Sequence, residues 1–305
     1  MKLLITGGTG FVGTRLLKKL KESGHELVVL TRHPEKAKKS DNVGATFHRW
    51  DGISEDIPAE AFNGIEGVIS LMGENIANKR WSDTQKKKLE DSRVKANLKL
   101  VEGIEKNCSS PLKVYIGSSA VGIYPTNSAE VLKENSGLGD SYLAGLCKKW
   151  EDAHNSIKNT ERKVIMRTGV VFGPEAGALA KLLPIFKLGL GGPIGNGAMI
   201  MPWIHVDDLV KAIVVFVNES NYEGTYNLVA PNPCSNAVFT KALASAVKRP
   251  AIFPVPSFML KLLMGEMSTI VLDSQNIHPE KLIQDGFKFD HPQVDEALKS
   301  MMSSS

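Results

Sequence analysis

Residues 2–13 read Lys-Leu-Leu-Ile-Thr-Gly-Gly-Thr-Gly-Phe-Val-Gly, and this stretch determines the fold. A short apolar run leads directly into a glycine-rich turn, and a helical pattern follows. The glycines fit G-x-G-x-x-G through Gly8, Gly10 and Gly13, and they also fit G-x-x-G-x-x-G when the motif starts at Gly7. Such glycines permit a tight turn, a close backbone approach to a pyrophosphate and close packing of the helix on the strand. The sequence therefore predicts a dinucleotide-binding turn. The residues expected to form it are Thr6, Gly7, Gly8, Thr9, Gly10, Phe11, Val12 and Gly13.

The same alternation continues along the chain, because further apolar runs are separated by helical patterns. The expected strands are Lys2–Thr6, Glu26–Leu30, Gly67–Leu71, Lys113–Gly117 and Lys163–Thr168. The expected helices are Thr14–Ser23, Ser82–Asn107 and Tyr142–Lys158. This alternation is typical of βαβ units. We therefore expect an α/β protein with a Rossmann-type, doubly wound parallel sheet.

The sequence changes in character after Gly173 and Pro174. Residues 188–197 are rich in glycine, and the chain beyond Pro231 is rich in proline and contains a second helical region. These features predict a smaller C-terminal α/β substrate lobe. The expected domain bounds are residues 1–173 for the Rossmann domain, completed by 203–228, and residues 174–202 with 229–305 for the smaller lobe.

Composition and charge argue against several classes of protein. The 305 residues are 42% hydrophobic and 23% charged, which is an ordinary globular mixture. The net charge of +4 is small and the basic residues are interspersed with acids, so we expect no nucleic-acid partner. The three cysteines form no C-x-x-C pair, and we expect neither a secretory signal nor a stretch of about 20 apolar residues that could span a bilayer. The expectation is a cytoplasmic protein with no membrane partner.

The end of the second strand predicts which dinucleotide is bound. In NAD-binding Rossmann domains an acidic residue about 20 positions after the glycines binds the ribose 2′-hydroxyl. Here Thr31 takes that place and Arg32 follows it, and a hydroxyl beside a guanidinium suits a 2′-phosphate. The predicted cofactor is therefore NADP(H). Two alternatives stay open, because Arg32 could be a solvated loop cation and Glu35 could serve as the acid on a displaced loop.

Nearly the whole chain resembles the extended short-chain dehydrogenase/reductase superfamily, and within it the atypical NAD-dependent epimerase/dehydratase-like proteins with a distinctive C-terminal domain. Besides the glycine turn, the motifs that carry the resemblance are Leu71-Met-Gly-Glu-Asn-Ile76, Asp91-Ser-Arg93, Ser118-Ser-Ala-Val-Gly122, Tyr142-Leu-Ala-Gly-Leu-Cys147, Arg167-Thr-Gly-Val-Val-Phe-Gly-Pro174, Trp203-Ile-His-Val-Asp-Asp208, and the tail from Leu272 to Phe289. The resemblance implies that Asp51 lies near the adenine and that residues 71–73 pass the cofactor. It extends the expected cofactor site to Asp51, Leu71, Met72, Gly73, Arg93 and Arg167.

In this superfamily, hydride transfer depends on a Ser or Thr, a Tyr, and a Lys four residues after the Tyr. By resemblance, Ser119 matches the hydroxyl that polarises a substrate carbonyl, and Tyr142 matches the acid/base. Residues four apart share a helix face, so the lysine can lower the pKa of the phenol and hold the nicotinamide ribose. The fourth residue after Tyr142 is Leu146, which can do neither, and Lys149 lies about 10 Å along the helix axis from Tyr142. A packing or pocket role for Tyr142 therefore stays open.

Two functions from different classes fit this sequence. The first is an NADP(H)-dependent oxidoreductase or epimerase that acts on a small polar or nucleotide-linked substrate. The second is an NADP-binding redox sensor or scaffold that has lost the catalytic lysine. We expect no metal, because His205, Asp207 and Asp208 lack a two-histidine helix spacing. The resemblance also makes a homodimer through the two long helices possible.

Overall fold

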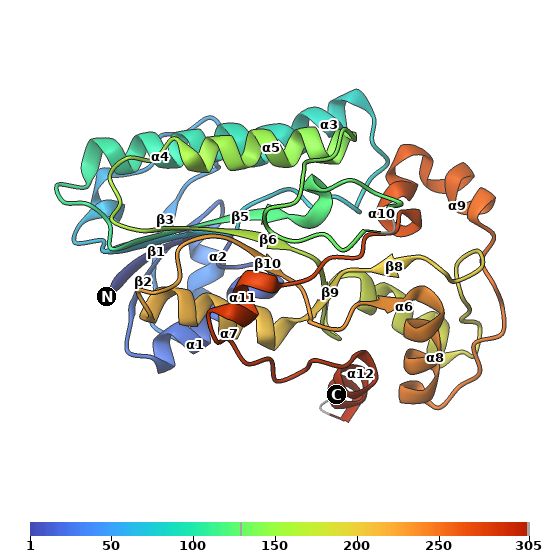
Figure 1. The fold of residues 1–305 in the computed structure, drawn as a ribbon. Coiled ribbons are helices and arrows are strands. Elements are labelled where there is room, and N and C mark those ends of the chain that lie inside the picture. Colours follow the sequence, from blue (N-terminus) through green and yellow to red (C-terminus); the bar gives the residue numbers. More distant parts are fainter. Residues whose placement is uncertain (129, 304–305) are drawn as a thin grey trace.

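A seven-stranded, fully parallel sheet forms the centre of the molecule (Figure 1). The structure is a computed structural model that describes residues 1–128 and 130–303. Its strands are β1 (Lys2–Thr6), β2 (Glu26–Thr31), β3 (Thr46–Arg49), β4 (Gly67–Ser70), β5 (Val114–Ala120), β6 (Lys163–Thr168) and β10 (Gly224–Leu228). Their order is β10-β6-β5-β4-β1-β2-β3. The winding changes direction at β1, between β4 and β2, which confirms the predicted doubly wound Rossmann sheet.

Helices cover both faces of this sheet, as the uninterrupted apolar sequence of its strands requires. Helices α1 and α7 pack with one set of strand side chains, and α4 packs with the set on the other face, beside α5 (Figure 1). The helices are α1 (Phe11–Glu22), α2 (Pro34–Lys39), α3 (Asp83–Glu90), α4 (Ala96–Asn107), α5 (Tyr142–Asn155), α6 (Gly177–Lys187), α7 (Val206–Asn218), α8 (Asn236–Val247), α9 (Ser257–Met264), α10 (Thr269–Leu272), α11 (Glu280–Gln284) and α12 (Val294–Ser303). Short 3-10 turns are η1 (Ala59–Phe62), η3 (Val121–Ile123) and η4 (Gly265–Ser268).

The helix predicted over residues 82–107 is interrupted by a π-helical turn, η2 (Asp91–Lys95). The Ala96 N–H donates to the Asp91 carbonyl five residues earlier, and the Asn97 side-chain amide donates to the Arg93 carbonyl, 2.5 Å from Nδ2 to O. The chain is thus helical over nearly the predicted residues, but the π turn was not anticipated, because apolar periodicity does not report a single inserted residue. Such π turns are frequent at functional sites.

A separate core holds the C-terminal lobe together. Apolar side chains of α6, α8 and α12 pack around Phe172 and Trp203, whose rings stack with centroids 5.6 Å apart. Two small sheets join this core to the rest of the chain: β7 (Val170–Phe172) pairs with β9 (Trp203–His205), and β8 (Ile200–Met201) pairs with β11 (Cys234–Ser235). Between the two lobe segments, α7 and β10 return to the main sheet, while the exact domain bounds stay a prediction. Within the described residues, no helix is long and apolar enough to cross a membrane.

Candidate cofactor and active site

The turn after β1 has no room for a side chain at Gly7 or Gly13. Gly7 has a φ of +72°, and a Cβ there would lie 2.8 Å from the carbonyl carbon and oxygen of Leu71. A Cβ on Gly13 would lie 2.3 Å from the Gly7 carbonyl oxygen and 2.6 Å from the Gly8 Cα. The Gly10 N–H donates to the Gly7 carbonyl across 3.0 Å and closes the turn. Helix α1 therefore starts in close backbone contact with this turn, as the motif predicts.

The N-terminus of α1 is free to receive an anion. Its N-cap residue, Gly10, is extended and provides no side-chain cap, and the first turn contains no acidic residue. The exposed Thr14 does not cap these N–H groups, because its hydroxyl donates to the Gly10 carbonyl across 2.9 Å. Uncapped N–H groups and the helix dipole favour negative charge at this position. The residues present therefore fit a dinucleotide pyrophosphate.

Thr31 and Arg32 lie at the carboxyl end of β2, on the same edge of the sheet as the turn. The Thr31 hydroxyl accepts the His33 N–H across 3.3 Å. Arg32 is exposed, and within residues 1–128 and 130–303 it makes no hydrogen bond or ion pair. Glu35, the alternative acid, is bound to Lys38 at 3.1 Å. Within the described residues, the Glu35 side chain is therefore paired, whereas that of Arg32 has no partner.

Asp51 closes a loop just beyond β3. Its carboxylate accepts the backbone N–H groups of Ile53, Ser54 and Glu55, as well as the Ser54 hydroxyl. These bonds, led by that of the Ser54 hydroxyl, hold the pKa of the Asp51 carboxyl below its usual range. Asp51 thus orders the loop that follows the third strand, and its expected place near an adenine stays a prediction.

Arg93 projects from the π turn beneath the loop that follows β4. A Cβ on Gly73 would lie 3.3 Å from the Arg93 guanidinium carbon. The guanidinium donates to the carbonyls of Leu89 and Glu74, and its carbon lies 5.0 Å from the Trp150 ring centroid. Burial lowers the pKa of Arg93 from its usual value. The structure therefore places a half-buried cation beside the Leu71–Gly73 segment, where Leu71 and Met72 are also half-buried.

Ser119 and Arg167 belong to one buried polar cluster. Ser119 lies inside β5, which extends three residues beyond its predicted end, and its hydroxyl donates to Glu151 Oε1 across 2.7 Å. Arg167 binds both oxygens of the same carboxylate, from Nε at 2.8 Å and from the second terminal nitrogen at 2.9 Å. The first terminal nitrogen donates to the Tyr124 hydroxyl, which donates to Asn227 Oδ1, and both of these distances are 2.8 Å.

The polar side-chain atoms of this cluster form hydrogen bonds with one another and with neighbouring groups of the protein. Although burial opposes the charge, the hydrogen bonds to Glu151 help to raise the pKa of the Arg167 guanidinium. Glu151 and Tyr124 were not among the predicted site residues. A carboxylate on the mostly apolar inner face of α5 was the available signal, because such a group needs a buried partner.

Tyr142 is the first residue of α5, which Ser141 caps by accepting the Ala144 N–H. Its ring is 5.2 Å from that of Trp81, and the Lys86 ammonium lies 4.6 Å from the ring centroid. Burial raises the pKa of the phenol, and the charge of Arg93 opposes this shift. Leu146 is buried against Trp81 and contributes only packing. The described cations nearest to Tyr142 thus come from α3 and the π turn, not from α5.

Two family models match this chain. The model of the NAD dependent epimerase/dehydratase family matches residues 3–228, and a domain of unknown function (DUF1731) matches residues 255–301. The chain belongs to the NAD-dependent epimerase/dehydratase family. This confirms the resemblance drawn from the motifs, including the distinctive C-terminal domain.

Two relatives, one of them also with a solved structure, are similar to this family member over nearly its whole length. It is 37% identical to the chloroplastic SDR39U1 homologue of Arabidopsis thaliana over 99% of this chain and 87% of the relative. It is 32% identical to the human epimerase family protein SDR39U1 over 99% of this chain and all of the relative. A crystal structure of human SDR39U1 with NADPH superposes with a TM-score of 0.89 at 31% identity and covers both chains fully.

The structure of this family member also brings His205, Asp207 and His291 together, with one potential ligand atom of each within 4.8 Å of the others. His205 caps α7, because its Nδ1 accepts the Asp207 N–H across 3.0 Å. Its ring stacks on that of His291 with centroids 3.8 Å apart. Burial, and then the charge of His291, lower the pKa of His205 to about 4. His291 was not anticipated, since it lies far away in the sequence.

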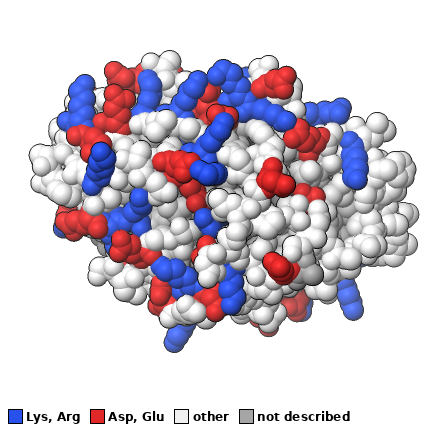
Figure 2. Space-filling view, turned by 45° about the horizontal axis from the view of Figure 1, so that its top comes forward, with Lys and Arg blue, Asp and Glu red and all other residues white. Residues whose placement is uncertain are grey.

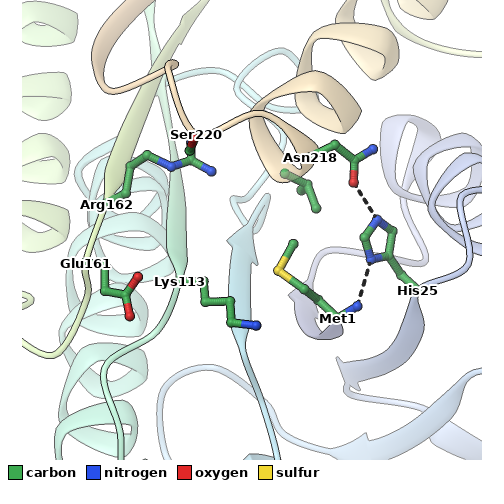
Figure 3. Close-up of a pocket in the computed structure, with 8 residues that line it drawn as sticks. Met1, His25, Lys113, Glu161, Arg162, Asn218 and Ser220 are labelled. Atoms are coloured by element: carbon green, nitrogen blue, oxygen red, sulfur yellow. Dashed lines mark hydrogen bonds between the residues drawn. The ribbon is translucent and has the colours of Figure 1, made fainter.

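A hollow of about 430 Å³ lies at the opposite edge of the sheet, where β1, β5 and β6 begin. Figure 3 shows side chains that line it. The His25 ring joins the Met1 amino group (3.4 Å) to Asn218 Oδ1 (3.0 Å) beside it. The residues that line it are Met1, His25, Lys113, Glu161, Arg162, Val217, Asn218 and Ser220. None of these residues belongs to the expected cofactor site, which lies at the carboxyl edge of the sheet. The five residues of β1 separate the two edges by about 16 Å, since a strand rises about 3.3 Å per residue.

His154 is expected to make the stability of the protein depend on pH. Its ring is fully buried, Nε2 lies 3.0 Å from the Ser118 carbonyl, and Nδ1 lies 2.7 Å from the Tyr115 hydroxyl. Since a carbonyl only accepts, Nε2 carries a proton, and in the neutral ring Nδ1 accepts from the Tyr115 hydroxyl. Burial lowers the pKa of His154 to about 3. Protonation in the unfolded chain begins near pH 6.5, so the stability from this residue is complete above that pH and is lost as the pH falls toward 3.

As the pH falls from about 6.5 toward 3, the protonation of His154 should lower the free energy of unfolding by up to about 1.4 kcal/mol per pH unit. Urea unfolding of the wild type and of His154→Gln between pH 7 and about pH 4 measures it. The variant should be less stable at pH 7 but show a shallower pH slope. Equal slopes in the two proteins would contradict this assignment. His205→Gln measures the separate contribution of His205, whose pKa is lowered to about 4, so that the slope lost in His154→Gln can be assigned to His154.

Proposed function

We propose that this family member binds NADP(H) at the turn after β1 and acts as an oxidoreductase or epimerase on a small polar or nucleotide-linked substrate. The observation that carries the proposal is the uncapped N-terminus of α1 above a glycine turn that admits no side chain at Gly7 or Gly13. That arrangement fits the pyrophosphate of a dinucleotide. The crystal structure of human SDR39U1 with NADPH supports the choice of cofactor.

Bound NADP(H) supplies or accepts a hydride. In this proposal Tyr142 exchanges the proton that accompanies it. Arg93 takes over the electrostatic part of the missing lysine, since its positive charge opposes the burial that raises the pKa of the Tyr142 phenol. Ser119 does not polarise the substrate, because its hydroxyl is buried and donates to Glu151. It is a positioning residue that fixes the end of β5.

Removing the guanidinium of Arg32 should weaken NADPH binding selectively. A charge-assisted contact with the 2′-phosphate contributes about 1.5–3 kcal/mol, so Arg32→Ala should raise the Kd for NADPH about 10- to 100-fold. The Kd for NADH should change little, because NADH lacks that phosphate. Calorimetric titration with both dinucleotides measures the difference. Arg49→Ala is the control, because Arg49 is also exposed but is paired with Glu55. If Arg32→Ala raised the Kd for NADPH and the Kd for NADH by the same factor, the assignment of Arg32 to the 2′-phosphate would be contradicted.

A substrate screen distinguishes catalysis from sensing. Leu146 is the observation that favours the second candidate, an NADP-binding redox sensor or scaffold, because a leucine cannot hold a ribose. For an enzyme, a screen of carbonyl compounds and sugar nucleotides should find NADPH oxidation that Tyr142→Phe lowers about 100-fold or more. NADPH binding by Tyr142→Phe should stay unchanged. Tight NADPH binding without turnover, together with a cofactor-dependent change in conformation, would instead support the sensor.

A further inference from the structure

Two segments of the C-terminal lobe carry basic residues but no acidic ones. Residues 176–202 and 229–265 contain no Asp or Glu. They contain six exposed basic residues, which are Lys181, Lys187, Lys241, Lys248, Arg249 and Lys261. Since the whole chain has a net charge of +4, the remainder of the chain is net acidic. Figure 2 shows the consequence: the end formed by α6, α8 and α9, on the right, is mostly white with blue at its rim, whereas red and blue alternate over the rest of this face.

The same lobe exposes many large apolar side chains. Helix α9 has no buried residue, and Leu262 and Phe258 are 73% and 70% exposed. The exposed large apolar residues of the two acid-free segments are Ile185, Leu188, Leu190, Val238, Ile252, Phe253, Phe258, Met259, Leu262 and Leu263. Scattered exposed leucines need no explanation, but a concentration of this kind in one lobe marks an interaction surface.

Backbone contacts make most of these residues neighbours. The Arg249 side chain donates to the Lys187 carbonyl across 3.2 Å, and the Phe253 N–H donates to the Gly191 carbonyl across 3.1 Å. The glycine-rich segment therefore runs beside residues 249–255, which lead directly into α9. We call the exposed side chains of residues 185–190, 249–253 and α9 the basic apolar surface.

The charges of this surface indicate what covers it. A second copy would bring an equally basic, acid-free surface against the first, so like charges would meet without partners. Protein interfaces are depleted of lysine, yet the cations of the lobe are almost all lysines. Lysine beside phenylalanine and leucine is instead the composition of segments that lie in the headgroup region of a bilayer. Lysine stems can remain in apolar contact there while the ammonium reaches the phosphates.

We propose that the basic apolar surface docks the protein onto the surface of an anionic lipid bilayer. Such peripheral contact needs no spanning helix. The apolar side chains of α9 and of the neighbouring loops enter the interface, and the surrounding lysines bind lipid phosphates. The electrostatic part is screened by salt and requires anionic lipid, so binding depends on both lipid charge and ionic strength.

Co-sedimentation of the full chain with vesicles tests this proposal. We expect binding to phosphatidylcholine vesicles that contain phosphatidylglycerol, about tenfold weaker binding to phosphatidylcholine alone, and a similar loss in high salt. The variant Phe258→Ser/Leu262→Ser should lower the partition coefficient about tenfold or more. Lys187→Gln/Lys261→Gln should weaken binding only to the anionic vesicles. The control Ile53→Ser/Leu98→Ser removes two exposed apolar residues outside the lobe and should bind like the wild type.

Two results would overturn the proposal. One is the absence of binding to anionic vesicles while light scattering shows a dimer that Phe258→Ser/Leu262→Ser dissociates, because the surface would then join two copies. The other is vesicle binding that neither lobe variant changes. NADPH titration of both lobe variants should match that of the wild type, so a failure of the docking proposal is separable from a failure of the proposed cofactor site.

Discussion

Replacing Glu151 with alanine is expected to lower the free energy of unfolding by about 3–5 kcal/mol, because it strands a buried charge. Glu151 and Arg167 are 8% and 7% exposed, and the carboxylate accepts two bonds from the guanidinium. In Glu151→Ala the guanidinium retains only the Tyr124 hydroxyl and a carbonyl oxygen, and the Ser119 hydroxyl loses its acceptor. Urea denaturation measures the loss.

Two further variants make this result interpretable. Glu102→Ala removes an exposed glutamate from the neighbouring helix α4, and its effect should stay within about 0.5 kcal/mol. Glu151→Met/Arg167→Met removes both charges and should recover much of the stability lost in Glu151→Ala, because no buried charge remains unpaired. If Glu151→Ala cost less than about 1 kcal/mol, water would have to replace the carboxylate, and the dry ion pair would be the wrong description.

The sequence was most informative where one local pattern requires one backbone geometry. The glycine turn, the parallel sheet and the covering helices follow from spacing and from alternation that neighbouring residues carry. The π turn could not be predicted, because Arg93 and Asn97 look like ordinary helical residues until the side-chain amide is seen on the Arg93 carbonyl. A single inserted residue leaves the apolar period on both sides nearly intact.

The candidate site was harder to predict because its partners are distant in sequence. Arg167 was expected at the cofactor from its motif, yet its guanidinium is bound by Glu151 and Tyr124, both of which belong to other elements. The loss of the lysine at position 146 was visible directly. What could not be seen is that Arg93, 49 positions before Tyr142, provides a positive charge near the phenol. A charge supplied from another helical segment leaves no local signal in the sequence around Tyr142.

Gly13→Ala should abolish measurable NADPH binding, because the new methyl group would lie 2.3 Å from the Gly7 carbonyl oxygen. The contacted atoms belong to the backbone, which cannot rotate out of the way as a flexible side chain can. Helix α1 must therefore move away from the turn. The N–H groups at the helix start then no longer point at the pyrophosphate, and we expect the Kd to rise at least about 100-fold. The overpacking should also cost about 1–3 kcal/mol of stability.

Gly145→Ala is the matched control for this change. Gly145 is exposed on α5, and a Cβ there meets nothing within 4 Å. Alanine is the better helix former, so Gly145→Ala should gain about 0.5–1 kcal/mol of stability and leave NADPH binding unchanged. Calorimetric titration and urea unfolding of both variants give the comparison. If Gly13→Ala bound NADPH like the wild type, the pyrophosphate could not rest on this turn, and the cofactor would have to bind elsewhere on the sheet. If both variants lost binding equally, the loss would not be specific to the contact between α1 and the turn.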